Sequence, residues 1–388
     1  MPRSPLNNQL AELVEEITPQ AVELRRLLHR HPEPGFQEHQ TTALISATLR
    51  ENGLAHELRK PNTGLWVDIG NDPSVGFRAD LDALPITEPE DNLPRSQNPG
   101  WMHACGHDAH SAIATGIALT LNRLDLDQGV RVLFQPAEES YPSGASELVA
   151  EGLVDGLKGL IAFHVDPNLD TGKVGAKTGP ITGSADGFTI TLNGPGGHTA
   201  RPNRTVDLVD ASARVIGELP GAIRRSIDSR IPIVTVFGSV HGGDALNVIP
   251  TEVVMSGTVR TLDRAVWDVL PGLVDKALGS LLAVSGADYH LDYRQGIPPV
   301  VNDGGVVEAA SAGITLYAGD DTIVPTDTSM GGEDFAHYLD IVPGALLRLG
   351  TCCGGGDLHS ASFKINEATI GFGIKAGVGA LIGMTERI

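Results

Sequence analysis

The spacing of apolar residues follows two patterns in the first part of the chain, one typical of helices and one typical of strands. Apolar positions recur at helical spacing over residues 8–30, where Pro19 interrupts them, and again over residues 38–53. We expect a first helix that breaks at the proline and a second helix after it. The two histidines in residues 29–35 could be ligands, but the prolines and glycine beside them favour a loop.

After residue 53 the apolar residues come in short continuous runs, which are typical of strands buried on both faces. The expected strands are residues 64–70, 75–79, 130–135 and 160–164, and a long helix is expected at about residues 107–124. Alternation of such strands with helices indicates an α/β fold. Charged or ligating side chains follow or close these strands, namely Asp80, Asp82, Glu138, Glu139 and His164. Because open α/β sheets bind ligands at the carboxyl ends of their strands, we expect a site there.

Residues 183–296 show a different order of elements. The pattern predicts strands at residues 187–192, 232–240, 252–260 and 288–293, and helices at residues 205–219 and 264–284. This βαββαβ order is that of a self-contained α+β unit of the ferredoxin-like kind. We therefore expect a catalytic domain in two segments, residues 1–182 and 297–388, with an inserted domain at residues 183–296. The second segment should contain helices at about residues 307–317 and 369–384.

Length and composition are those of a globular protein of two domains. The 388 residues exceed what one ordinary core accommodates. The net charge of −20, from 48 acidic and 28 basic residues, argues against nucleic acid and anionic membranes as partners. We find no apolar run as long as a membrane span, and the first six residues lack the apolar core of a signal peptide, so we expect a cytoplasmic protein.

The densest chemistry lies at residues 103–110, which hold three histidines, a cysteine and an aspartate. Cys105 and His107 are two residues apart and can reach one metal ion, and thiolate and imidazole are ligands that zinc prefers. The remaining cysteines, Cys352 and Cys353, are adjacent, so the chain can build neither a Cys-rich structural zinc site nor a disulfide framework. Any further ligands must be carboxylates or histidines elsewhere, with positions left for water, as in a catalytic site.

Three more residues complete a set of five ligand candidates. Glu139 belongs to an adjacent carboxylate pair, in which one member can bind metal while the other, Glu138, acts as general base. His164 closes a strand, and His359 follows a glycine-rich segment that can bend sharply enough to return it to the site. Each alone could equally be structural. Together the five suit two ions that share one bridging ligand, for which we take Cys105.

The chain contains seven motifs in order, at residues 78–86, 103–110, 134–139, 163–165, 196–198, 331–335 and 358–360. Together they resemble the amidohydrolase branch of the dinuclear-metal aminoacylase and carboxypeptidase family. That branch includes hippurate hydrolases, N-acyl-amino-acid amidohydrolases and auxin-conjugate hydrolases. The resemblance runs from about His29 to the C-terminus. It implies an aminopeptidase-like catalytic domain with an inserted lid and dimerisation domain.

The resemblance also implies roles for particular residues. The positions that bind the two ions in similar enzymes match Cys105, His107, Glu139, His164 and His359. Glu138 matches the general base, and Asp80 matches a residue that orients a ligand, a role that Asp108 could share. The wider family has a ligand histidine where this chain has Arg78, and the amidohydrolase branch resembles this chain in supplying His107 instead. The expected ions are Zn²⁺ or Mn²⁺, with Co²⁺ or Ni²⁺ as alternatives.

Three residues of the inserted domain match lid residues of the family. In similar dimers, a histidine at the place of His198 reaches the neighbouring subunit's site and stabilises the oxyanion. Asn247 and Arg260 match residues that hold the substrate's carboxylate, a task suited to the planar fork of arginine. The resemblance therefore implies a homodimer formed through the inserted domain.

We therefore expect a metal-dependent hydrolase that cleaves the amide bond of N-acyl amino acids, with acyl groups from acetyl to larger aroyl. A dipeptidase or carboxypeptidase would use the same site. A thiol hydrolase with Cys105 as nucleophile would leave the other ligand candidates unexplained. A binding protein on this fold would lack a ligand or the base, and none is missing here. Ala361 stands where relatives often have proline, and we expect Cys352 and Cys353 to be packed in the interior.

Overall fold

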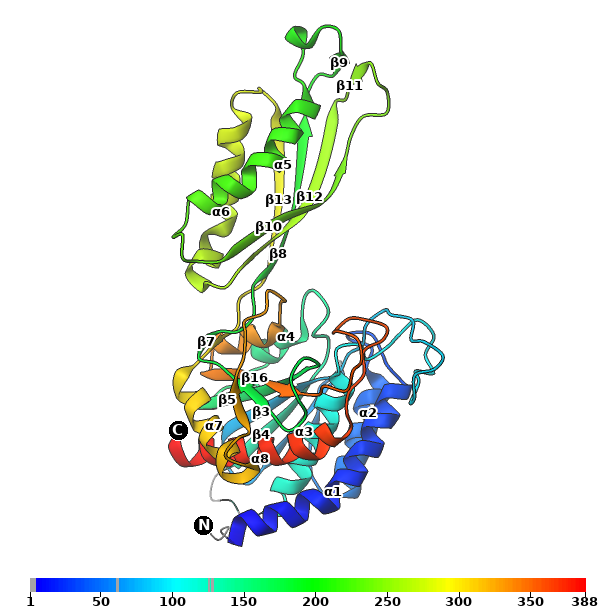
Figure 1. The fold of residues 1–388 in the computed structure, drawn as a ribbon, viewed down its shortest axis with the longest axis vertical. Helices are drawn as coiled ribbons and strands as arrows, with labels where there is room; N and C mark the ends of the chain where they lie inside the picture. The colour runs from blue at the N-terminus through cyan, green and yellow to red at the C-terminus, as the bar shows by residue number, and fades with distance from the viewer. Residues whose placement is uncertain (1–4, 61–62, 125, 127–128) are drawn as a thin grey trace. The chain divides into compact units, whose positions relative to one another are not determined.

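The computed structural model describes residues 5–60, 63–124, 126 and 129–388, and it divides into two compact units (Figure 1). The larger unit comprises Met1–Gly179, Asn302–Asp327 and His337–Ile388, and the inserted unit comprises Pro180–Val301 and Thr328–Ala336. Our expected second catalytic segment included residues 328–336, which here group with the inserted unit. The expectation about a signal peptide rests partly on residues 1–4, which lie outside the described residues.

A mixed eight-stranded sheet forms the centre of the larger unit, in the order β1-β2-β4-β3-β5-β16-β6-β15. Its strands are β1 (Glu57–Leu58), β2 (Leu65–Ile69), β3 (Pro73–Asp80), β4 (Gly129–Gln135), β5 (Gly159–Asp166), β6 (Val174–Ala176), β15 (Ile323–Pro325) and β16 (Gly344–Gly350). The four central strands, β4, β3, β5 and β16, run parallel. Their carboxyl ends therefore share one edge of the sheet, and the predicted α/β class is confirmed.

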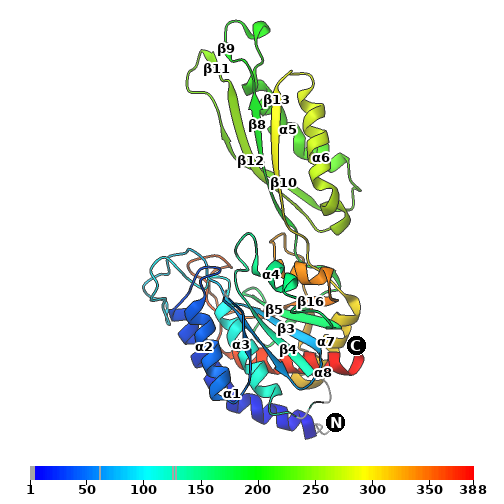
Figure 2. The same cartoon turned by 180° about the vertical axis from the view of Figure 1, so that it is seen from behind.

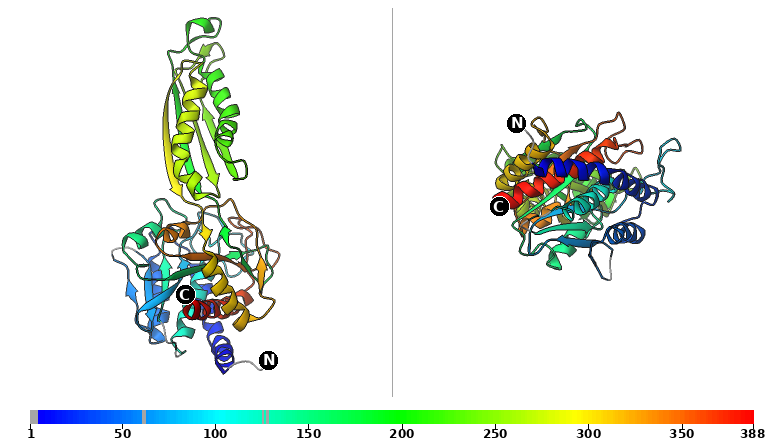
Figure 3. Two further views of the ribbon diagram at one scale, coloured as in Figure 1. Left: turned by 90° about the vertical axis from the view of Figure 1, so that its left-hand side faces the viewer. Right: turned by 90° about the horizontal axis from the view of Figure 1, so that it is seen from below.

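The larger unit contains the helices α1 (Pro5–Arg30), α2 (His39–Glu51), α3 (His107–Leu121), α4 (Gly144–Ala150), α7 (Gly304–Ala318) and α8 (Ala368–Arg387). Helix α8 packs against α1, α3 and α7 (Figure 3), and their apolar side chains join those of the sheet in one core. Among the described residues, only α8 is long and apolar enough to cross a membrane, a property that our reading of the sequence overlooked. Since 72% of its 18-residue apolar window is buried, α8 has the surroundings of a core helix.

Helix α1 differs from the expected structure in two ways. It continues through Pro19, and it includes His29 and Arg30, which we had assigned to a loop. Leu13 and Leu24, on either side of the proline, are buried in the core. Their burial outweighs the one backbone hydrogen bond that proline removes, because tertiary packing overrides local propensity.

The inserted unit has the predicted βαββαβ order. It contains β8 (Ala185–Asn193), α5 (Leu208–Arg225), β10 (Ile233–His241), β12 (Glu252–Thr261), α6 (Arg264–Leu282) and β13 (Asp288–Ile297). Its four strands are antiparallel in the order β10-β12-β8-β13, and α5 and α6 cover one face (Figure 2). The shorter elements are β7 (Gly179–Pro180), β9 (Gly197–His198), η1 (Pro202–Arg204), β11 (Val248–Ile249), β14 (Val301–Asn302) and η2 (Asp334–Asp340).

Candidate metal centre

The site candidates of the larger unit gather at the shared carboxyl edge of the central strands. Asp80 ends β3, the Glu138–Glu139 pair follows β4, and His164 lies near the end of β5. His359 lies in the loop after β16, which pairs with β5 so that Arg348 stands opposite His164. The pattern of apolar residues did not predict β16, although this strand is what returns the chain to the site.

The amino end of α3 brings Cys105 and His107 to the same edge. Gly106, between them, has a φ of +80°, and a Cβ placed there would lie only 2.5 Å from Val165 Cγ2. Glycine is therefore required at this turn. All fifteen residues of α3 are buried, so the two side chains start from a rigid support.

Cys105 occupies the middle of the ligand cluster. Its Sγ lies 3.4 Å from His164 Nε2 and 3.3 Å from His359 Nε2. The same His359 nitrogen is 3.1 Å from Glu139 Oε1. Ligands that bind one zinc ion at roughly 2 Å stand about 3–4 Å from one another, so these spacings fit a shared cation.

A second group of possible ligand atoms overlaps the first. Cys105, Glu139 and His359 form one group within 4.8 Å, and His107, Glu138 and Glu139 form another. Buried His107 Nε2 has no hydrogen-bond partner in the described part of the chain, and it faces carboxylate oxygens of Asp80 at 3.8 Å and Glu138 at 4.0 Å. Because buried polar atoms are nearly always satisfied, this atom fits a metal ligand. The structure thus brings together all five predicted ligands and Glu138.

The other ring nitrogens of two ligand candidates are held by the protein. His107 Nδ1 donates to the backbone oxygen of Asp82 at 2.9 Å, and His164 Nδ1 donates to that of Val165 at 2.8 Å. These bonds fix the tautomers that leave each Nε2 free for the site. Asp82 also accepts the Glu139 backbone N–H at 2.9 Å. We had not assigned Asp82 a role, although its place two residues beyond Asp80 at a strand end was a usable signal.

Asp80 makes different contacts from those of Asp82. Its carboxylate lies 2.6 Å from His110 Nδ1 and accepts from Arg78 at 2.7 Å. His110 Nε2 in turn accepts the backbone N–H of Val165, next to His164. Burial alone would raise the pKa of Asp80, but His107, His110 and Arg78 outweigh it and hold that pKa well below its usual range. Asp80 is therefore a buried anion beside the site, and its orienting role remains a prediction.

Burial also determines the state of the central thiol. It raises the pKa of Cys105 to about 12, and, with help from Arg348, it lowers the pKa of His164 well below the usual value. Without a cation the thiol is therefore protonated at neutral pH, whereas a coordinating thiol is deprotonated by its metal. A thiol nucleophile would need the thiolate without a metal, so this environment argues against the thiol-hydrolase alternative.

His29 and Asp108 belong to a buried charge network that adjoins the candidate metal centre, because Asp108 directly follows His107 in α3. His29 Nδ1 is 2.8 Å from Asp108 and its Nε2 is 2.9 Å from Glu88, while Arg25 Nε is 2.7 Å from Asp108. His103 is also buried nearby, and burial lowers its pKa to about 4. Both nitrogens of His29 are engaged by carboxylates, so His29 supports α3 and is not available as a ligand.

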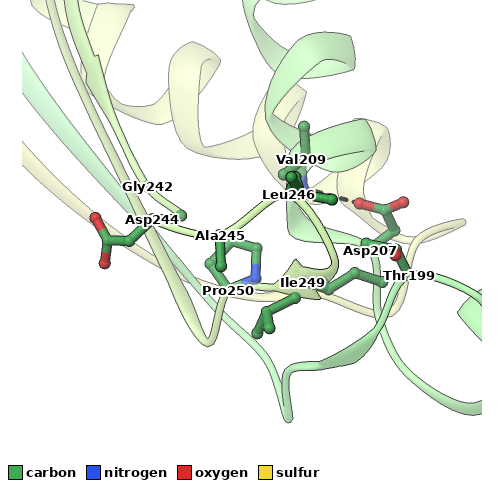
Figure 4. Close-up of a pocket in the computed structure, with 11 residues that line it drawn as sticks. Thr199, Asp207, Val209, Gly242, Asp244, Ala245, Leu246, Ile249 and Pro250 are labelled. Carbon is green, nitrogen blue, oxygen red and sulfur yellow. Dashed lines mark hydrogen bonds between the residues drawn. The ribbon is translucent and has the colours of Figure 1, made fainter.

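In the inserted unit, His198 and Asn247 lie together. His198 pairs with Val248, and the Thr199 N–H donates to Asn247 O at 3.2 Å. His198 Nδ1 accepts the Ala200 N–H at 3.0 Å, which leaves the ring proton on Nε2 as a donor. A hollow of about 500 Å³ lies beside them, and Leu246, Ile249 and Pro250 are among its lining residues (Figure 4).

Arg260 lies in β12 of the four-stranded sheet, towards the end of the strand that is farther from His198 and Asn247. It is eight residues along β12 from Glu252, which pairs with Asn193 at the end near His198 and Asn247. Eight residues of strand span roughly 25 Å. One substrate carboxylate therefore cannot contact Asn247 and Arg260 of the same chain. Arg260 Nη1 donates to Met330 O at 2.9 Å.

The expectation for Cys352 and Cys353 is wrong, because both are exposed. β16 ends at Gly350, and the next residues belong to a surface loop. Cys353 Sγ donates a hydrogen bond to the backbone oxygen of Lys364 at 3.3 Å. The general tendency of cysteine to be buried gave no information about this loop.

A family model described as Peptidase family M20/M25/M40 matches residues 76–382. An N-acetyl-L-cysteine deacetylase of Bacillus subtilis (strain 168) is 34% identical over 386 residues, covering 95% of this chain and 91% of the relative. An N-acyl-L-amino acid amidohydrolase of Geobacillus stearothermophilus is 37% identical over 299 residues, covering 76% of this chain and 81% of the relative.

One solved structure is that of the YXEP protein of Bacillus subtilis, described as a dinuclear metal binding peptidase from the M20 family. It matches with a TM-score of 0.85 and 31% identity, over 96% of this chain and 100% of that one. A longer relative from Rhodococcus jostii (strain RHA1), named as a glutamate–cysteine ligase 2-3, is 41% identical over 359 residues. The match covers 91% of this chain but only 45% of that relative.

Proposed function

Because the chain belongs to peptidase family M20/M25/M40, we propose that it hydrolyses the amide bond of N-acyl amino acids, releasing a carboxylate and a free amino acid. The observation that carries this proposal is the single cluster of Cys105, His107, Glu139, His164 and His359 with Glu138 beside it. The relatives named as a deacetylase and an amidohydrolase support the substrate class.

When bound, two divalent cations would supply Lewis acidity and lower the pKa of a water molecule in this cluster. Glu138 is only 8% exposed, and its carboxylate lies 4.0 Å from His107 Nε2. Both observations support the proposed role of this carboxylate as the base that takes the proton of the attacking water. It then passes that proton to the leaving amine. The His198 Nε2–H would donate a hydrogen bond to the oxyanion. The thiolate and imidazole donors favour Zn²⁺, with Mn²⁺ as the next candidate.

Metal reconstitution tests this proposal. Chelated protein is assayed for release of amino acid from a panel of N-acyl amino acids and dipeptides, before and after addition of Zn²⁺ or Mn²⁺. We expect activity to return with metal and to favour N-acyl amino acids. Preference for dipeptides would move the assignment to a dipeptidase. Activity that persists in the chelated protein would contradict metal dependence, and inactivity of protein shown to bind two ions would favour a binding protein.

We also propose a homodimer formed through the inserted unit. Strand β10 is an edge of its sheet, and three of its valines, Val234, Val236 and Val240, are 41–53% exposed. Leu246, near His198, is 98% exposed. Unpaired edges and exposed apolar groups are features of protein interfaces. The separation of Asn247 from Arg260 also supports a site that takes these two residues from different chains.

We propose a cytoplasmic location as well, because exposed cysteines without a disulfide partner, such as Cys352 and Cys353, suit a reducing compartment.

Complementation between two inactive variants tests the dimer. Glu138→Ala and His198→Ala proteins are unfolded together and refolded, so that mixed dimers form. If His198 acts on the partner subunit's site, each mixed dimer regains one intact site, and the mixture recovers roughly a quarter of wild-type activity. No recovery, in a mixture shown to contain mixed dimers, would place His198 in its own subunit's site. Full activity of the His198→Ala protein alone would place His198 outside the chemistry.

A further inference from the structure

The turn that carries Glu138 has an unusual backbone conformation. Ala137, directly before Glu138, has a φ of +54° and is fully buried. A residue with a Cβ rarely adopts this left-handed conformation, and it persists only where the surroundings hold it. The direction of the Glu138 side chain therefore depends on what fixes Ala137.

Glu38 forms a hydrogen bond with Ala137 from a distant part of the chain. One carboxylate oxygen accepts the Ala137 N–H at 2.7 Å, and the other accepts the hydroxyl of Thr63. Glu38 stands at the start of α2 but makes no side-chain cap there. Glu33 does so instead, accepting the N–H groups of Gln40 and Thr41. The Glu38 carboxylate is thus directed away from its own helix and towards the turn.

Glu38 is fully buried, and its partners in the described part of the chain are neutral groups. Burial raises its pKa to about 7. A buried carboxylate without a cationic partner is costly to the fold, so its place here calls for an explanation beyond packing. We find such an explanation in its contact with the Ala137 N–H, because this contact holds the strained turn directly before Glu138.

The other side of Glu138 is held in the same way. Asp82 accepts the N–H of Glu139 at 2.9 Å, and the Gly144 N–H donates to Ala137 O at 3.0 Å. Gly35 packs so closely that a Cβ there would lie 2.2 Å from Ser140 Oγ and 3.1 Å from Ala137. The backbone N–H groups before and after Glu138 are therefore each bound by a buried carboxylate.

We propose that Glu38 is a positioning residue for the hydrolysis: by binding the Ala137 N–H it holds the left-handed turn that aims the Glu138 carboxylate. This inference rests on the proposed role of Glu138 as general base. In this proposal Glu38 acts through Ala137 and Glu138 and has no direct contact with substrate or cation. A purely structural role, joining α2 to the segment before β2 through Thr63, is the competing explanation.

The test compares metal-loaded Glu38→Ala, Glu38→Gln and Glu33→Ala proteins in steady-state kinetics with an N-acyl amino acid. We expect Glu38→Ala to lower kcat roughly 10- to 100-fold, because small misplacement of a catalytic group has effects of that size. KM and metal content should change less than about threefold, since the ligands keep their own supports. Glu38→Gln should restore most of kcat, because its amide oxygen can accept the Ala137 N–H and its NH₂ can donate to Thr63.

Glu33→Ala is the matched control, since it also removes a carboxylate that binds backbone N–H groups next to α2. It should lower thermal stability and leave kcat unchanged. Equal kcat values for Glu38→Ala and Glu33→Ala, or a Gln variant as slow as the Ala variant, would overturn the proposal. Should Glu38→Ala fail to fold, Glu38→Asp takes its place, because its carboxylate is one methylene too short to keep both contacts.

Glu138→Ala, measured in the same series, separates the two proposals. Activity that survives Glu138→Ala overturns the general base and the role of Glu38 together. Activity that is lost in Glu138→Ala but kept in Glu38→Ala and Glu38→Asp overturns only the role of Glu38.

Discussion

The candidate metal centre has a buried half and an open half, and they are built differently. Cys105, His107 and Glu138 are at most 8% exposed, whereas the side chains of Glu139 and His359 are 18% and 52% exposed. Helix α3 and bound carboxylates fix the buried half. The open half includes the ligand candidate His359, on a loop that contains three consecutive glycines. A centre of this kind can be rigid where the proton is transferred and accessible where substrate and cation enter.

The adjacent pair Glu138 and Glu139 gives the largest expected contrast between the halves. Glu138→Ala should lower kcat roughly 10²- to 10⁴-fold while two ions per chain are retained, because it removes the proposed base and no ligand. Glu139→Ala should also be inactive, but with a reduced ion content. Kinetics and elemental analysis of purified protein distinguish the two. Activity in Glu138→Ala, or equal ion loss in both variants, would contradict the division of labour.

The network behind the buried half predicts a pH-dependent stability. Burial and Arg25 lower the pKa of His29, but Asp108 and Glu88 outweigh them, so the pKa is raised above 6.5. Stabilisation by protonated His29 is therefore fully present below about pH 6.5 and is lost as the pH rises through the folded-state pKa. His29→Gln should cost about 3 kcal/mol at pH 6, as breaking a buried ion pair does, and less at higher pH.

Denaturant unfolding of chelated protein between pH 6 and 9 measures this effect, with His31→Gln as the control two residues away. If the loss of unfolding free energy caused by His29→Gln stays constant over this pH range, the contacts of His29 with Asp108 and Glu88 make no pH-dependent contribution to stability.

Two of the proposed ligand histidines, His107 and His359, test whether the buried half is formed without metal. In chelated protein, His107→Ala should lower the free energy of unfolding by roughly 1–3 kcal/mol, because it leaves Asp80 and Asp82 with fewer partners in the interior. His359→Ala should change it by less than about 0.5 kcal/mol, as for an exposed side chain. Both should lose bound ions. Equal losses of stability would mean that the two halves are equally preformed.

The parts of the molecule that could be predicted from sequence are those in which pattern and environment agree. Strands β2, β3, β4 and β5 are continuous apolar runs, and the apolar residues of the inserted unit are regularly spaced. The sequence therefore predicted these four strands and the elements of the inserted unit. β16 was missed because seven residues bounded by glycines look like a loop. Helix α1 was misread at Pro19 because propensity is local and the burial that overrides it is tertiary.

The residues of the candidate site also fall into those that the sequence predicted and those that only the fold reveals. The order of the motifs was enough to propose the five ligands, which the structure brings together. The contacts of Asp82 and Glu38 depend on which backbone N–H groups the fold places opposite them, 57 and 99 residues away in sequence. Residue type and spacing do not carry that information. Asn247 and Arg260 share a proposed role, and only the register of β12 shows that they lie far apart within one chain.

The three thiols differ in exposure more sharply than the other groups compared here, and replacing the two exposed thiols is expected to have the smallest effect on activity. Cys352 and Cys353 are exposed on the loop, so in native chelated protein they should react with a disulfide reagent within the mixing time at pH 8. Cys105 is 5% exposed and burial raises its pKa to about 12, so it should react only after denaturation. Replacing the two exposed cysteines by serine should change kcat/KM less than about twofold, because substitutions of exposed side chains usually have small effects and Cys353 Sγ binds the Lys364 backbone. Three rapidly reacting thiols would show that the buried half opens without its cations, and a tenfold loss of activity in the serine variants would show that the loop positions His359 through these residues.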